Sequence, residues 1–239
     1  MKTRLLPLLL LALTAHAQAP LFSAPIAPLT PQQRAAMTGK SWKPGCPVSL
    51  DDLASVRVTY WGFDNQTHQG TIVLHKRFAP EAYDIFNQLY SARFPIYKVD
   101  LWDSYGPDVY AQQDITVGFY CQHSDDDPNQ WNSHAYGLAI DLNPRENPFQ
   151  NPKSGWWPAS SAVFAPRDNG QGKISPDSPA FRIFMRHGWV WGGFSPGSPD
   201  LMQFSKLTYG GSGSPLDRPY TATSLQSTPE PAPQTTPPQ

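Results

Sequence analysis

Two side chains of the types that bind zinc lie close together in residues 133–141, which read SHAYGLAID. His134 offers an imidazole nitrogen, Asp141 offers a carboxylate oxygen, and Gly137 lies between them. A catalytic zinc commonly takes three protein ligands and leaves the fourth position to a water molecule, which the ion acidifies. The segment therefore predicts two of three ligands, and the rest of the chain must supply the third.

The local pattern predicts how these two side chains are positioned. Residues 138–142 alternate like a strand, with Ala139 and Asp141 on one face. Gly137 allows a turn between His134 and this strand, so both side chains can reach one ion. A surface turn without a metal is the alternative interpretation of these residues taken alone.

The other periodic segments are short and of mixed type. Thr30 and Pro31 suit the start of a helix over residues 31–37. Further helices are predicted over 79–94 and 178–186, and strands over 56–61, 71–76, 96–101 and 201–206. Because strands and helices do not alternate regularly, the pattern favours an α+β fold, with a small mixed or antiparallel sheet and flanking helices.

The two ends of the chain differ from its middle in composition. Residues 1–17 have a basic start, a short apolar run and Ala15-His16-Ala17, a pattern typical of an export signal. A short buried helix is the alternative. We expect a flexible segment over 18–30, one domain over 31–209 and a disordered tail rich in Pro, Ser and Thr over 210–239.

Charge and cysteine content narrow the partners and the compartment. The formal net charge of −1 does not favour nucleic acid, and no segment is apolar for long enough to span a bilayer. We expect a monomer without stable membrane insertion. In an exported chain Cys46 and Cys121 are expected to form a disulfide, with two buried free thiols as the alternative.

The chain resembles the VanY-like D-alanyl-D-alanine carboxypeptidases and L-alanyl-D-glutamate endopeptidases, zinc peptidases that cut peptidoglycan stem peptides. Their motif S-x-H-x-x-G-x-A-x-D is met by His134, Gly137, Ala139 and Asp141. Further similar fragments are Gly45-Cys46-Pro47, Trp61-Gly62-Phe63-Asp64, Asn143-Pro144, Asn147-Pro148 and residues 188–193. The resemblance implies the VanY-like (hedgehog/DD-peptidase) fold and zinc as cofactor.

The resemblance also shows where this chain departs from the family. A D-x-x-H element there supplies the general base and the third zinc ligand, and here it reads Asp200-Leu201-Met202-Gln203. The resemblance thus implies Asp200 as base and makes Gln203 a weak substitute ligand, because an amide oxygen binds zinc less well than imidazole. Two positions that the resemblance implies to bind substrate also differ. Gln122 stands where the family often has an arginine. Two positions before the ligand His134 the family has a serine, and here that position is Asn132, with Ser133 directly before His134.

Several other residues admit two interpretations. His123 is interpreted either as a replacement zinc ligand or as a solvated loop residue. His187 is interpreted as a cation at the end of a helix rather than as a ligand. The acidic run 125–127 is a solvated loop or a calcium site. The tryptophans pack in the core or line a groove for glycan or peptide; they are Trp156, Trp157, Trp189 and Trp191.

Together these patterns predict an exported zinc metallopeptidase, periplasmic or extracellular, acting on peptidoglycan peptides as a carboxypeptidase or endopeptidase. His134 and Asp141 with Gln203 would hold the zinc. The alternative hypothesis is a catalytically inactive relative that keeps the fold and binds cell-wall peptide, suggested by the departures at Gln122, Asn132 and Gln203.

Overall fold

The computed structural model describes residues 26–124 and 127–206. Its helices and strands are β1 (Ile26–Pro28), α1 (Pro31–Met37), β2 (Leu53–Trp61), β3 (Thr67–His75), α2 (Ala79–Ser91), β4 (Lys98–Val99), β5 (Ile115–Thr116), β6 (Ala139–Asp141), β7 (Phe149–Asn151), β8 (Gly155–Trp157), α3 (Pro179–Arg186), β9 (Val190–Trp191) and β10 (Gln203–Ser205). Short 3-10 helices are η1 (Leu50–Asp52), η2 (Trp102–Ser104), η3 (Ser133–Tyr136), η4 (Ala159–Phe164) and η5 (Gly192–Phe194). The chain is a mixed α and β protein with small sheets and few helices, which agrees with the expected α+β class.

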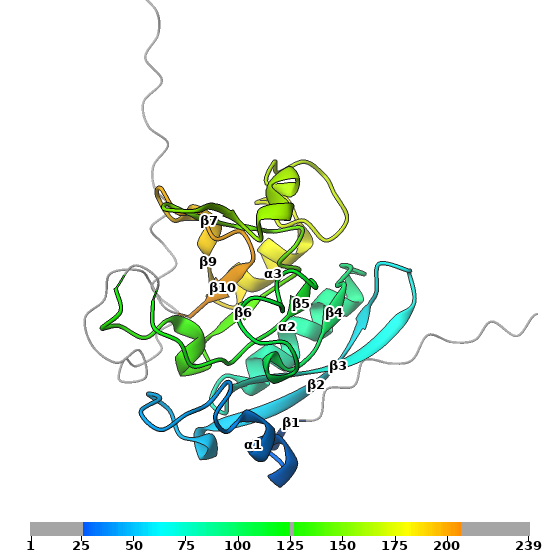
Figure 1. Cartoon of the computed structure of the whole chain (residues 1–239). Coiled ribbons are helices and arrows are strands. Elements are labelled where there is room, and N and C mark those ends of the chain that lie inside the picture. The colour runs from blue at the N-terminus through cyan, green and yellow to red at the C-terminus, as the bar shows by residue number, and fades with distance from the viewer. Residues whose placement is uncertain (1–25, 125–126, 207–239) are drawn as a thin grey trace, which may run out of the picture.

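A long antiparallel hairpin of β2 and β3 forms one side of the fold, and β1 pairs along the other edge of β2 (Figure 1). Helix α2 packs against β2 and buries the apolar residues that recur at helical spacing, namely Ala82, Ile85, Phe86 and Leu89. The hairpin and α2 therefore form a rigid support onto which the later strands are built.

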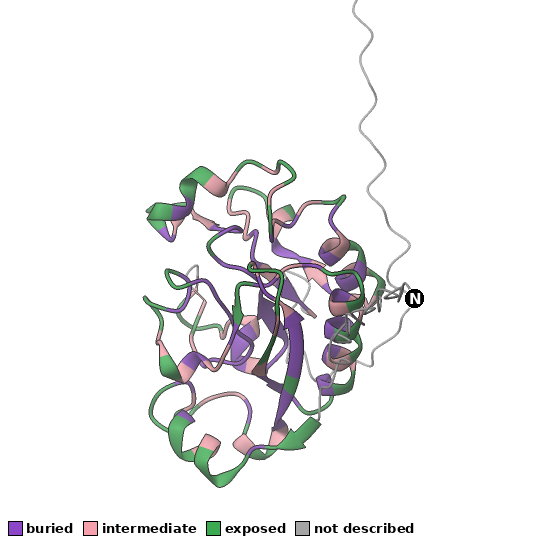
Figure 2. Ribbon diagram, turned by 90° about the vertical axis from the view of Figure 1, so that its right-hand side faces the viewer, coloured by how far each residue is buried: buried purple, intermediate pink, exposed green. Residues whose placement is uncertain are grey.

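The main core lies between these elements and the second half of the chain. Strand β10 pairs antiparallel with both β6 and β9, and Phe204 of β10 stacks on Phe184 of α3 with ring centroids 4.0 Å apart. Figure 2 shows buried residues along the strands and the inner faces of the helices, with exposed residues in the surrounding loops. Because β6 is buried along its whole length, its carboxylate lies inside the fold.

The structure differs from the sequence predictions at several boundaries. The segment expected to be flexible, residues 18–30, includes β1, which hydrogen-bonds through its backbone while its side chains stay exposed and so leave no apolar pattern. The predicted strand over 96–101 is regular only in β4, and the hairpin of β7 and β8 was not predicted. The predicted export signal and the whole of the predicted tail lie outside the described residues.

The predicted disulfide is present. Cys46 and Cys121 are bonded, with Cα atoms 6.0 Å apart and 75 positions between them in sequence. Both cysteines belong to a second, smaller core with Leu53, Val73 and Phe119, so the bond ties the N-terminal segment to the segment that precedes the motif. Among the helices that the structure describes, none has the length and apolar character needed to cross a membrane.

Candidate active site

His134 is carried by η3, and the turn around it is capped at both ends. The Asn132 side chain accepts a hydrogen bond from the Ala135 amide over 2.9 Å, and Gly137 ends the turn in the left-handed conformation with φ 68°. A Cβ atom at Gly137 would lie 2.4 Å from the His75 amide nitrogen. The predicted need for glycine is therefore confirmed, and it has two causes, the backbone conformation and the close approach of β3.

Asp141 is the last residue of β6, and two neighbours fix its backbone. Its amide and carbonyl exchange hydrogen bonds with Val117, and its Cα is paired with that of Gln203 on β10. Its side chain meets that of His134, with 3.1 Å between Asp141 Oδ1 and His134 Nε2. Both side chains are almost fully buried, so the sequence prediction that the two residues converge is confirmed.

The other ring nitrogen of His134 faces a backbone carbonyl. His134 Nδ1 lies 2.6 Å from the Gly118 oxygen, and because a carbonyl only accepts, Nδ1 carries a proton. Burial lowers the pKa of His134, but the charge and hydrogen bond of Asp141 together with the Gly118 carbonyl raise it above its usual value. In the neutral form Nε2 keeps its lone pair, the arrangement typical of a metal-binding histidine.

Two buried tyrosines hold the second oxygen of Asp141. Tyr110 donates to Asp141 Oδ2 over 2.9 Å and Tyr120 over 3.4 Å. The Tyr120 ring also stacks on the His134 ring, with 4.2 Å between centroids. Burial and the Asp141 charge raise the pKa of both phenols well above their usual value, so both hydroxyls are protonated donors.

Asp200 lies beside this pair, in the turn that leads into β10. Backbone hydrogen bonds from Met202 and Gln203 reach its carboxylate, whereas its buried Oδ1 atom has no hydrogen-bond partner within the described residues. Burial, and then the charge of Asp141, raise the pKa of Asp200 to about 7. A carboxyl group with this pKa can both accept and return a proton near neutral pH.

Gln203 lies where the third ligand is expected. In an antiparallel pair, opposite residues project from the same face of the sheet, so the pairing of Gln203 with Asp141 puts both side chains on one face. Within the described residues, no group of three His, Cys, Asp or Glu side chains is arranged to hold a metal ion. The structure thus brings together two strong ligands, one amide and one base.

Other predicted residues have different surroundings. The Gln122 carbonyl accepts from the Asn132 amide, so both help to form the turn before η3, and Ser133 begins that turn. His123 stacks on Trp131 at 3.8 Å, and within the described residues no hydrogen bond or ion pair joins it to the site. His187 lies at the C-terminal end of α3, as predicted. Asp125 and Asp126 of the acidic run lie outside the described residues.

All four tryptophans pack in or against the hydrophobic cores, Trp156, Trp189 and Trp191 in the main core and Trp157 in the core around Tyr110, and the predicted groove role stays untested. Trp189 and Trp191 are buried core residues. Trp157 is half-buried and packs against Tyr110, with ring centroids 5.6 Å apart, which places it next to the tyrosines that contact Asp141.

Sequence reasoning missed Tyr110 and Tyr120. Their contacts with Asp141 span 31 and 21 positions, and no periodicity or motif spacing links residues so far apart. The only signal in the sequence is the gathering of aromatic residues over 102–120, which also fits ordinary core packing.

Comparison with known proteins agrees with this geometry. The family model described as D-alanyl-D-alanine carboxypeptidase matches residues 126–206, a segment that includes His134, Asp141, Asp200 and Gln203. No curated protein and no solved structure gives a significant match. The segment that carries the site, residues 126–206, is therefore similar to the D-alanyl-D-alanine carboxypeptidase family, which supports the suspected VanY-like resemblance.

Proposed function

We propose that the chain is an exported zinc peptidase that hydrolyses peptide bonds in peptidoglycan stem or cross-link peptides. The observation that supports this most strongly is the buried contact of His134 with Asp141 beside Asp200, inside the segment that matches the family. The family suggests the substrate, and the export pattern and the disulfide suit a protein that acts in the cell wall.

The residues present fit a zinc ion in part. His134 and Asp141 would hold it, and each already has the outer hydrogen bond that orients a ligand, to Gly118 and to Tyr110 respectively. The unpartnered Oδ1 of Asp200 is an acceptor that the protein leaves unsatisfied, as expected for a group that faces a reacting water. Zinc bound here would acidify a water molecule and polarise the scissile carbonyl.

Asp200 performs the proton transfers in this proposal. Its pKa of about 7 lets it take a proton from the attacking water and then deliver that proton to the leaving amine. The two backbone amides that hold its carboxylate fix its direction during both steps. The hydrogen bonds from the two tyrosines hold the Asp141 carboxylate in position while the charge on Asp200 changes.

The proposal is tested by zinc stoichiometry of the purified protein together with cleavage of isolated muropeptides. We expect bound zinc and cleavage for the wild type, and for Asp200→Asn bound zinc with a rate lower by about 100-fold or more. Asp177→Asn, an exposed change, is the matched control. Wild type that neither holds zinc nor releases a product would refute the proposal.

Gln203 favours a second candidate function, a catalytically inactive relative that binds cell-wall peptide. With an amide in place of the third imidazole, metal affinity falls while the shape of the site is kept. This candidate predicts retention of the protein on purified sacculi without release of peptide. Failure to sediment with sacculi would count against it.

A further inference from the structure

The support segment, residues 117–121, follows β5 directly and flanks the site. The Gly118 carbonyl lies 2.6 Å from His134 Nδ1 and so orients that ring. Val117 and Asp141 exchange two backbone hydrogen bonds, of 3.0 and 3.1 Å. A displacement of this short segment would therefore change the surroundings of both expected zinc ligands at once.

Tyr120 adds side-chain contacts from the same segment. Its ring stacks on that of His134, with 4.2 Å between centroids, and its hydroxyl lies 3.4 Å from Asp141 Oδ2. Tyr120 directly precedes Cys121 in the chain, so a shift of the cysteine moves the tyrosine as well. The disulfide is thus attached next to the residue that touches both expected ligands.

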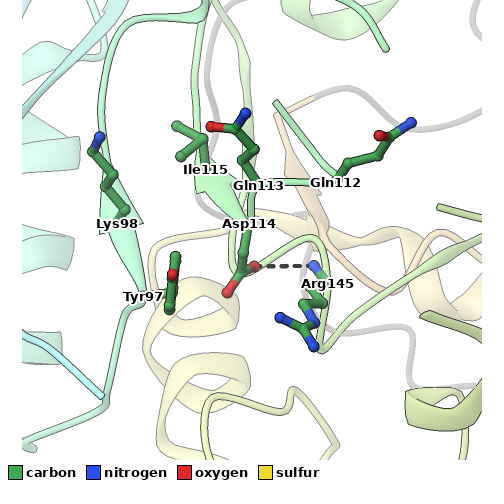
Figure 3. Close-up of a pocket in the computed structure, with 7 residues that line it drawn as sticks. All are labelled: Tyr97, Lys98, Gln112, Gln113, Asp114, Ile115 and Arg145. Carbon is green, nitrogen blue, oxygen red and sulfur yellow. Dashed lines mark hydrogen bonds between the residues drawn. The ribbon is translucent and has the colours of Figure 1, made fainter. Parts of the chain in front are cut away.

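The start and the middle of this stretch are held by hydrogen bonds to other parts of the fold. One residue before β5, Asp114 Oδ1 accepts a hydrogen bond from the Arg145 amide over 3.0 Å (Figure 3). Within the support segment, the Phe119 amide donates to the Val73 carbonyl of β3 over 2.8 Å. Neither contact involves the disulfide, so the chain up to this point has supports of its own.

The far end of the support segment depends on the disulfide. Cys121 is buried and bonded to Cys46, and its amide donates to the Ser41 carbonyl over 2.8 Å. After Cys121 the chain leaves the core and reaches the exposed residue His123. Residues 39–47 form turns rather than a helix or a strand, so the covalent bond is their strongest link to the support segment.

We propose that the Cys46–Cys121 disulfide positions the metal site, so that the site is complete only in the oxidised chain. Reduction by a dithiol breaks the S–S bond, gives each sulfur one electron and one proton, and converts the dithiol to its own disulfide. The freed end of the support segment loosens, and His134 and Asp141 lose the fixed partners that orient them as ligands.

The bond therefore makes zinc affinity depend on the compartment. A chain in a compartment that keeps thiols reduced holds zinc weakly, and a chain under oxidising conditions holds it tightly. The proposal rests on the proposed zinc peptidase for the identity of the metal, but the positioning itself is measurable without metal.

Amide hydrogen exchange of the metal-free protein, followed by NMR, tests the positioning. Oxidised wild type is compared with wild type reduced by dithiothreitol and with the double variant Cys46→Ala, Cys121→Val, in which valine fills the space of the lost sulfurs. We expect the amides of Phe119 and Asp141 to exchange at least about tenfold faster without the bond, while those of α2 change less. Leu89→Ala empties part of the main core and is the control for lost stability; it should accelerate the α2 amides instead.

Competition titration with a zinc indicator tests the consequence for the metal. We expect the double variant to bind zinc at least about tenfold more weakly than the wild type, and Leu89→Ala to bind it as the wild type does. The double variant takes the place of reduced wild type in this measurement, because free thiols and dithiothreitol bind zinc themselves.

Unchanged exchange of Phe119 and Asp141, or equal acceleration of all amides, would overturn the proposal. Equal zinc affinity of the wild type and the double variant would also overturn it, as would unfolding of both forms that lack the bond, since the bond would then hold the whole fold. Selective loosening in a protein that neither binds zinc nor cuts muropeptides would uphold the positioning and refute the zinc peptidase. Zinc binding and cleavage that are the same with and without the bond would do the reverse.

Discussion

The Tyr110 hydroxyl donates a 2.9 Å hydrogen bond to Asp141 Oδ2, on the side of the carboxylate away from His134. This contact ties the turn before β5 to the end of β6, 31 positions later. It leaves Oδ1 directed at the His134 ring. The orientation of the carboxylate is thus set by a residue outside the sequence motif.

Tyr110→Phe should weaken zinc binding by about tenfold or more, because removing the outer partner of a ligand has this typical effect. Tyr120→Phe is the graded comparison. Its hydroxyl lies farther away, at 3.4 Å, and its ring stacking on His134 is kept, so the loss should be smaller. Competition titration with a zinc indicator measures both. Equal affinities of wild type and Tyr110→Phe would show that Tyr110 does not position Asp141.

Gln203→His should raise zinc affinity by about tenfold or more, because imidazole nitrogen is a better zinc ligand than amide oxygen. The pairing of Gln203 with Asp141 places the new ring on the correct face of β10. Gln32→His adds a histidine on the exposed side of α1 and is the control. If both variants bind zinc as the wild type does, position 203 is not a ligand position. If only Gln203→His cleaves muropeptides, the natural chain is inactive.

Part of the fold and of the site could be predicted from the sequence, because some of the signals are local. The convergence of His134 and Asp141 was predictable because only a glycine turn and a short strand separate them. The amphipathic helix α2 and the hairpin strands were predictable because periodicity is a local property. Such signals identify an element without fixing its neighbours.

The rest of the site was not predictable because it depends on long-range packing. The phenols of Tyr110 and Tyr120 reach Asp141 only through the fold, and the pairing of β10 with β6 joins residues 62 positions apart. The strand over 96–101 was predicted too long because only Lys98 and Val99 find a partner strand. Strand β1 was missed because it is held by backbone bonds with exposed side chains.

Loss of the disulfide should lower the free energy of unfolding by about 4–5 kcal/mol, the chain-entropy value for a loop of this length. The bond spans 75 positions and links the N-terminal segment to residues just before the motif. The double variant Cys46→Ala with Cys121→Ala should unfold at lower denaturant concentration, and wild type under reducing conditions should match it. Coincident curves for oxidised wild type and the double variant would contradict this.

Glu146 should make the stability of the chain fall as the pH rises. Its pKa is raised from 4.5 to about 9 by burial and by Asp114, so the folded chain holds a proton that the unfolded chain has released. The stabilisation is fully present below about pH 4.5 and is lost progressively up to about pH 9.

Glu146→Gln keeps the shape of the side chain without the titrating proton, so its free energy of unfolding should decline less over this range. Chemical denaturation at several pH values measures the difference, with the exposed change Asp108→Asn as control. Parallel pH profiles for wild type and Glu146→Gln would mean that the two buried acids do not share a proton.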